Sequence, residues 1–304
     1  MARDRLRNVA ASVRQRLLNH STVIKADPNL VLTWYGLERL LYKLSLSVHR
    51  DRFVLKGAML FRLWGGTDFR STKDLDLLGF LRDEAEVVRD AFVSICEQVA
   101  EDDGMVFDAS SVRVAEIRDG QAYGGFRVLL TAKLGTAVLP LQIDVGFGDA
   151  VTPAPIYADF PSLLDQPRPH IRIYPRETVV AEKFEAMVQL GMTNSRMKDY
   201  YDLWFMSRRF DFDGPLLAAA IRATFERRAT TLYETVPVGL TSVYADDSSH
   251  VRQWTAFSRR VGGDKPPALM DVIDAVGEFV LPPARAAIES RAFPRRWTPQ
   301  AAWH

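Results

Sequence analysis

The chain has 304 residues, of which 47% are hydrophobic and 25% charged, and its formal net charge at pH 7 is +1. This composition is typical of a folded globular protein and excludes a disordered or fibrous one. The longest apolar runs are interrupted by Lys133 and Asp274, so no membrane-spanning segment is predicted. The charge is uneven, because residues 1–50 contain nine Lys and Arg against three Asp and Glu. This excess can serve polyanion binding or simply solvate helix faces.

The predicted elements divide the chain near Pro175. Residues 1–50 are predicted to form two helices, with a break at Asp27-Pro28. Alternating and apolar runs then predict six strands and two helices: strands at 52–57, 74–80, 112–117, 126–134, 139–147 and 171–174, and helices at 58–64 and 84–101. Residues 152–169 are predicted to be a Pro-rich loop.

The sequence after Pro175 is predicted to be almost wholly helical. The expected helices lie at 178–190, 196–209, 215–228, 249–261 and 268–280. The predicted fold class is therefore α+β, with a mixed sheet followed by a helical C-terminal domain. The expected domains are N-terminal helices that pack on the core (1–50), a core (51–175) and a helical domain (176–304).

Cys96 is the only cysteine in the chain. A single cysteine cannot form an intramolecular disulfide, which favours a reducing, cytoplasmic location. Its apolar neighbours Val93, Ile95 and Val99 indicate a small buried hydrophobic residue rather than a catalytic thiol.

Asp74 and Asp76 stand two apart in the predicted strand at 74–80. Strand side chains alternate, so the two acids face one side while Leu75 and Leu77 enter the core. Adjacent carboxylates repel each other unless a cation or water screens them, and Mg²⁺ prefers such oxygen ligands. A two-residue acidic pattern by itself also fits a solvated strand face.

Asp144 is the one acid in the apolar strand predicted at 139–147. If this strand pairs beside the one at 74–80, Asp144 joins Asp74 and Asp76 on one face. Three acids on adjacent strands can hold two metal ions for phosphoryl transfer. Alternatively, Asp144 is a polar residue near a strand end.

Lys183, Asp199 and Asp202 lie in two of the predicted C-terminal helices. Lys183 flanks an apolar helix face, where it can reach a triphosphate or extend along the rim with little effect on stability. Asp199 and Asp202 are three apart and share a helical face, among aromatic residues. They fit either a functional cluster or a surface ion-pair network.

The motifs, taken in order, resemble the AbiEii/AbiGii toxin family of nucleotidyltransferases, which includes MenT-like toxins of type IV toxin–antitoxin systems. The resemblance rests on five segments spanning residues 53–203: Phe53-Val54-Leu55-Lys56-Gly57, Arg70-Ser71-Thr72-Lys73-Asp74-Leu75-Asp76-Leu77, Ile143-Asp144-Val145, Glu182-Lys183-Phe184-Glu185-Ala186 and Arg196-Met197-Lys198-Asp199-Tyr200-Tyr201-Asp202-Leu203. It implies a polymerase-β-like nucleotidyltransferase core, a helical C-terminal domain and a cognate antitoxin.

The resemblance also implies roles for individual residues. Metal binding falls to Asp74 and Asp76, with Asp144 as a third carboxylate for two Mg²⁺ ions. Nucleoside triphosphate binding falls to six residues: Lys56, Gly57, Arg70, Ser71, Thr72 and Lys183. Lys183 is also counted as catalytic, together with one of Asp199 and Asp202, between which the resemblance does not decide.

The implied reaction moves a nucleoside monophosphate from an NTP to an acceptor hydroxyl and releases pyrophosphate. The expected acceptor is an RNA 3′ end, with tRNA preferred. Arg295 and Arg296 beside Trp297 support this, because they could hold a phosphate and stack a base. Three alternatives remain: nucleotidylylation of a partner protein or of the enzyme itself, a small-molecule acceptor, and a catalytically silent interaction module.

Overall fold

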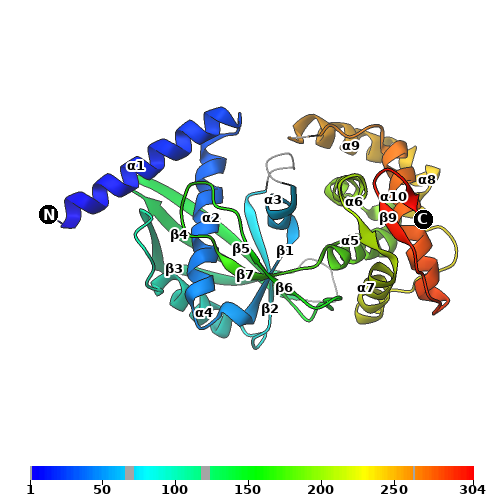
Figure 1. The fold of residues 1–304 in the computed structure, drawn as a ribbon, viewed down its shortest axis with the longest axis horizontal. Coiled ribbons are helices and arrows are strands. Elements are labelled where there is room, and N and C mark those ends of the chain that lie inside the picture. Colours follow the sequence, from blue (N-terminus) through cyan, green and yellow to red (C-terminus); the bar gives the residue numbers. More distant parts are fainter. Residues whose placement is uncertain (1, 66–71, 118–123, 263) are drawn as a thin grey trace. The chain divides into compact units, whose positions relative to one another are not determined.

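A computed structural model describes residues 2–65, 72–117, 124–262 and 264–304 (Figure 1). The chain divides into two compact units. The first comprises Met1–Gly148 and Ile156–Ile173, and the second comprises Asp149–Pro155 and Tyr174–His304. The three domains expected from the sequence, 1–50, 51–175 and 176–304, stay a prediction. The two units are defined by contacts between residues and do not test where domains begin and end.

The first unit begins with two helices, α1 (Ala2–Val23) and α2 (Pro28–Leu46). The Asp27 carboxylate caps α2 by accepting from the backbone N–H of Leu30 at 3.0 Å, and Pro28 supplies a helix-compatible φ at the first position. The break that Asp27-Pro28 predicts is therefore confirmed.

Seven strands of the described chain form one sheet in the order β3-β4-β5-β2-β1-β7-β6. Their bounds are β1 (Phe53–Lys56), β2 (Asp74–Gly79), β3 (Met105–Ile117), β4 (Gly125–Leu134), β5 (Ala137–Phe147), β6 (Ile156–Asp159) and β7 (His170–Ile173). β2 pairs with β5 and β1 with β7 in parallel, and the other pairs are antiparallel. The predicted mixed sheet in an α+β fold is confirmed.

Short helices connect or cover the strands of this sheet. They are the 3₁₀ turns Arg50–Arg52 and Gly57–Met59, then α3 (Leu60–Gly65) and α4 (Ala85–Glu97). α2 packs on β5 and α4 on β3, over the face where alternate strand residues such as Leu75 and Ile143 are buried (Figure 1). The opposite face carries the polar positions of β2, β4 and β5.

Three details of the first unit differ from the prediction. α4 ends at Glu97 rather than 101, because Lys43 donates to the carbonyls of Cys96 (3.0 Å) and Gln98 (2.5 Å) and so supplies their partners. β3 starts at Met105 instead of 112, after a turn at Gly104 with φ +76°. The predicted loop at 152–169 contains β6, an exposed edge strand paired only with β7.

The second unit is mainly helical. Its helices are α5 (Arg176–Leu190), α6 (Met197–Arg209), α7 (Gly214–Arg227), α8 (Ser242–Ala245), α9 (Ser248–Arg260) and α10 (Leu269–Ile288), with 3₁₀ turns at Gly191–Thr193 and Val238–Leu240. The predicted helix end at residue 280 is wrong, because α10 continues through Pro282 and Pro283 to Ile288, and Ala284, Ala286 and Ala287 in this part are buried.

A small sheet also forms in the second unit, where only helices were expected. Its strands are β8 (Phe212–Asp213), β9 (Arg296–Thr298) and β10 (Ala302–Trp303) in the order β10-β9-β8. Trp297 in β9 is 6% exposed and donates through its ring N–H to the carbonyl of Ser207 at 2.7 Å. The expectation that Trp297 stacks a base is wrong, because the ring is part of the core.

Candidate active site

The polar face of the first unit's sheet carries the three predicted metal-binding aspartates and Lys56. Asp74 and Asp76 on β2 are partly exposed, whereas Leu75 and Leu77 are each 1% exposed. The alternation expected from the sequence is therefore present. In the parallel pairing of β2 with β5, Asp76 lies opposite Asp144. This pairing satisfies the condition under which Asp144 shares the face of the two other acids.

The same register continues across two further strands. Lys56 on β1 lies opposite Asp76, and Arg127 on β4 lies opposite Asp144. The four side chains thus form one cross-strand row, Lys56–Asp76–Asp144–Arg127, with the acids in the middle and a cation at each end. The Lys56 ammonium reaches over Gly146, where an added Cβ would lie 3.5 Å from it.

Gly57 provides the space in which the Asp76 carboxylate lies. Its φ is +71°, and a Cβ added there would come within 2.0 Å of Asp76 Oδ2. Any other residue would therefore combine backbone strain with a direct clash. Gly57 begins a three-residue 3₁₀ turn, and the α3 helix that follows has six residues, so the helix predicted at 58–64 is a 3₁₀ turn followed by a short α-helix.

Asp144 is engaged by Arg127 through two hydrogen bonds. Arg127 Nε donates to Oδ1 at 2.9 Å and Nη2 donates to Oδ2 at 2.8 Å. The side-chain amide of Gln142 lies beside this pair. With its oxygen oriented toward Arg127, that oxygen accepts a hydrogen bond from Arg127 Nε at 3.1 Å. Sequence reasoning missed Arg127, whose only signal was a cation at an outward position of a predicted strand.

The donor set fits Mg²⁺ in part. Asp74 and Asp76 present carboxylate oxygens from one strand face, as a magnesium site completed by phosphate oxygens requires. Within the described ranges, no group of three or more His, Cys, Asp or Glu side chains is placed to hold a metal ion. The third predicted carboxylate, Asp144, is held by Arg127 in this arrangement.

The segment before β2 is anchored to α2. Trp34 donates through its ring N–H to the Thr72 carbonyl at 2.6 Å, and the Arg62 guanidinium stacks over the same ring at 4.2 Å. The backbone of Thr72 is thus held by α2, and its role in nucleotide binding remains a prediction. Arg70 and Ser71 lie outside the described residues.

Lys183, Asp199 and Asp202 meet in the second unit, between α5 and α6. The Lys183 ammonium lies 2.6 Å from Asp199 Oδ1 and 2.7 Å from Asp202 Oδ2. The side chains are 14%, 6% and 0% exposed, respectively. The alternative of a surface ion-pair network is wrong, because both acids are buried. Lys183 is also mostly buried, so it does not extend along a solvent-exposed helix rim.

A second buried ionic cluster adjoins α5 and was not anticipated. Arg228 approaches Glu185 at 2.7 Å, Asp149 at 3.0 Å and Glu182 at 3.6 Å. Burial raises the pKa of Tyr174 well above its ordinary range, and the nearby charge of Glu182 adds to the effect. Glu182 and Glu185 were noted in sequence only as neighbours of Lys183, because nothing local indicates that Arg228 and Asp149 lie beside them.

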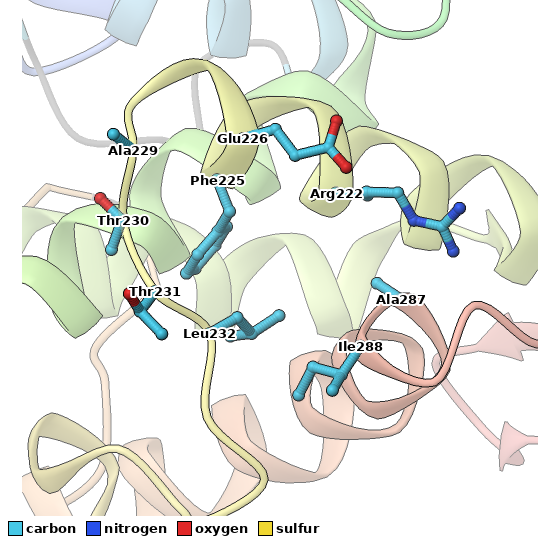
Figure 2. A pocket seen from close by; sticks show the side chains of 9 residues that line it. All are labelled: Arg222, Phe225, Glu226, Ala229, Thr230, Thr231, Leu232, Ala287 and Ile288. Carbon is cyan, nitrogen blue, oxygen red and sulfur yellow. The ribbon is translucent and has the colours of Figure 1, made fainter.

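A surface pocket of about 440 Å³ lies in the second unit between α7, α10 and the segment 229–232 (Figure 2). Figure 2 shows the Phe225 ring and the Leu232 and Ile288 side chains at its apolar end, with Arg222 and Glu226 at its polar end. The lining includes no predicted site residue.

Two further expectations concern Cys96 and membranes. Cys96 is buried, and burial raises the pKa of its thiol to about 12, which opposes a nucleophilic role. In the described part of the chain, no helix is both long and apolar enough to cross a membrane.

Comparison with known proteins gives a family and two structural neighbours. The family described as "Nucleotidyl transferase AbiEii toxin, Type IV TA system" matches residues 39–289. Among solved structures, a candidate nucleotidyltransferase from H. pylori is 15% identical with a TM-score of 0.43, over 90% of this chain and 95% of that chain. JHP933 from Helicobacter pylori is 15% identical with a TM-score of 0.42, over 90% and 92%. No curated protein matches.

Proposed function

Because the chain belongs to the AbiEii family of nucleotidyltransferase toxins of type IV toxin–antitoxin systems, we propose that it transfers a nucleoside monophosphate from an NTP to an RNA 3′ hydroxyl, preferably of tRNA. Modification of that end would block translation and growth, and a cognate antitoxin would counteract it. The observation that carries the proposal is the cross-strand row Lys56–Asp76–Asp144–Arg127. Gly57 lies beside this row and, having no side chain, leaves room for the Asp76 carboxylate.

The proposed reaction is an in-line displacement at the α-phosphorus. The acceptor oxygen forms a bond to phosphorus, the bond to the bridging oxygen breaks, and pyrophosphate leaves. Asp74 and Asp76 would hold Mg²⁺, which neutralises charge on the phosphate oxygens when bound. Lys56 adds a cation next to Asp76, and Asp144 would bind one of the ions and accept the acceptor's proton.

The second unit supplies a different kind of group. Lys183 holds Asp199 and Asp202 together, so we assign it first to the packing of α5 on α6. Both acids contact the lysine, and their roles are therefore linked. Contact of Lys183 with the nucleotide remains a prediction.

An RNA acceptor is supported by the excess of Lys and Arg in residues 1–50. Arg39 and Lys43 do not contribute to this support, since Arg39 is 0% exposed and Lys43 donates to the carbonyls of Cys96 and Gln98. The tail contributes less than expected, since Trp297 is buried and Arg296 pairs with Asp211 at 2.7 Å. Protein hydroxyls are the competing acceptor, and the experiment below separates the two.

The test is a transfer assay with each α-labelled NTP, Mg²⁺, purified tRNA and total lysate protein in one mixture. A parallel reaction contains tRNA whose 3′ hydroxyl is blocked, and the matched control is the double variant Asp74→Asn/Asp76→Asn. We expect label in intact tRNA and none in blocked tRNA or with the variant. Label confined to protein, or equal labelling of blocked tRNA, would overturn the RNA acceptor.

A further inference from the structure

Arg127 holds the carboxylate of Asp144, which the proposed reaction needs as a base for the acceptor's proton. Both Asp144 oxygens accept from one guanidinium, and the side chains of Arg127 and Asp144 are 41% and 21% exposed. An ion pair in contact with water is exchanged at little cost, unlike a buried one. Arg127 can therefore leave Asp144 when another oxyanion is offered.

The shape of the Arg127 guanidinium indicates which kind of anion could replace Asp144. Its planar fork matches two oxygens of a carboxylate or of a phosphate, and phosphate is the match that an incoming acceptor can bring. Asp144 lies next to Asp76 in the row, so a phosphate that binds Arg127 stands on the far side of Asp144 from the proposed metal ligands. This is where the chain of an acceptor would continue away from its reacting hydroxyl.

The surface beyond Arg127 suits a nucleic-acid strand. Leu129 and Lys133 follow Arg127 on the same face of β4, and both are exposed. Arg113 on β3 lies opposite Leu129 and is also exposed. The acid on this face of β3, Asp108, is bonded to the Ser110 hydroxyl at 2.6 Å. Within the first unit, the face thus offers the cations Arg127, Lys133 and Arg113 to a phosphate backbone.

We propose that Arg127 is the acceptor-phosphate residue of this enzyme. In the free protein it holds Asp144, and on acceptor binding it transfers to the phosphodiester next to the reacting 3′ hydroxyl and so releases Asp144. The inference rests on the proposed function and narrows its acceptor to a nucleic-acid chain. It also accounts for the guanidinium beside Asp144 at the acceptor end of the row.

The first test measures metal binding without any turnover. Mn²⁺ is titrated into the full-length protein, its Arg127→Met and Arg127→Lys variants, and an Arg113→Met control, with paramagnetic resonance reporting free metal. Release of Asp144 should tighten Mn²⁺ binding in Arg127→Met by about three- to tenfold, with less change in Arg127→Lys and none in Arg113→Met. Unchanged Mn²⁺ affinity in Arg127→Met would overturn the competition for Asp144.

The second test is a chemical double-mutant cycle on the acceptor. Short RNA acceptors carry either a normal phosphodiester or an uncharged methylphosphonate before the terminal nucleoside. Arg127→Met and the methylphosphonate should each raise the acceptor KM about tenfold, and together no more than either alone. Arg127→Lys should be intermediate, because it keeps the charge and loses the fork.

Additive effects of the two changes would overturn the contact while leaving RNA transfer itself intact. Transfer by the parent protein to protein hydroxyls alone would overturn this inference together with the RNA acceptor of the proposed function. In that case the Mn²⁺ titration still shows whether Arg127 competes for Asp144, so the two failures are distinguishable.

Discussion

Two clusters in this molecule each combine two aspartates with a lysine, and they differ in burial. Asp74, Asp76 and Lys56 lie on a partly exposed sheet face of the first unit. Asp199, Asp202 and Lys183 lie between two helices of the second unit, where the acids are 4% and 0% exposed as whole residues. Residue types alone would not distinguish the two groups.

The difference in burial decides what each cluster can do. Charges in contact with water can exchange one partner for another, as a site that takes up a metal ion and a triphosphate must. Buried charges that lose a partner incur a large desolvation penalty, so Lys183 and its acids are committed to each other. The comparison predicts that substitutions in the first cluster mainly lower transfer activity. Substitutions in the second cluster should mainly lower the free energy of unfolding.

The largest expected effect is the loss of transfer in Asp74→Ala and Asp76→Ala. Removal of a metal ligand should lower kcat by about 100- to 1,000-fold, because it removes several kcal/mol of charge stabilisation. The melting temperature should stay level or rise slightly, since one of two neighbouring like charges is gone. Labelled NMP transfer and thermal unfolding measure the two quantities. Activity within about tenfold of the parent in either variant would contradict the assignment.

The comparison is sharpened by one substitution made in both clusters. Lys183→Met leaves two buried carboxylates without their shared cation and should cost about 3–5 kcal/mol of unfolding free energy. Lys56→Met, on the partly exposed face, should cost under about 1 kcal/mol while lowering transfer. Urea unfolding gives both free energies. Equal losses of stability would mean that burial does not separate the clusters.

A smaller effect on activity than the loss of a metal ligand is expected from a glycine substitution. Gly57→Ala should cost about 1–2 kcal/mol for its positive φ and should also displace Asp76, with a fall in kcat of tenfold or more. Gly135→Ala is the matched control, because its φ is +61° and its nearest neighbour would lie 3.8 Å away. Circular dichroism melts and the transfer assay should show similar stability losses and normal activity in the control. A parallel loss of activity in Gly135→Ala would remove the special role of Gly57.

Local pattern was sufficient for the elements and for single faces of them. The alternation in Asp74–Gly79 placed Asp74 and Asp76 together, and Asp27-Pro28 marked the start of α2. The three-residue spacing of Asp199 and Asp202 placed both on one side of α6, where both contact Lys183. Each of these signals depends only on residues that are a few positions apart in the sequence.

Other features depended on neighbours distant in sequence. α4 stops where Lys43 satisfies its last carbonyls, and α10 continues past two prolines into a segment whose alanines are buried. Trp297 looked like a stacking surface beside two arginines but is buried in the core. The residues next to each position in the sequence do not indicate which distant residues it will contact.

The sequence by itself therefore determined the class of elements, the acidic face of one strand and the resemblance to a toxin family, because periodicity and motif order are local properties. Only the tertiary structure decided that Asp144 lies opposite Asp76, that Arg127 holds it, and that Gly57 makes room for Asp76. Strand order and register bring together residues far apart in the chain, such as Lys56 and Gly146, or Leu55 and Ile173. Such pairings follow from packing of the whole sheet, which no short stretch of chain encodes.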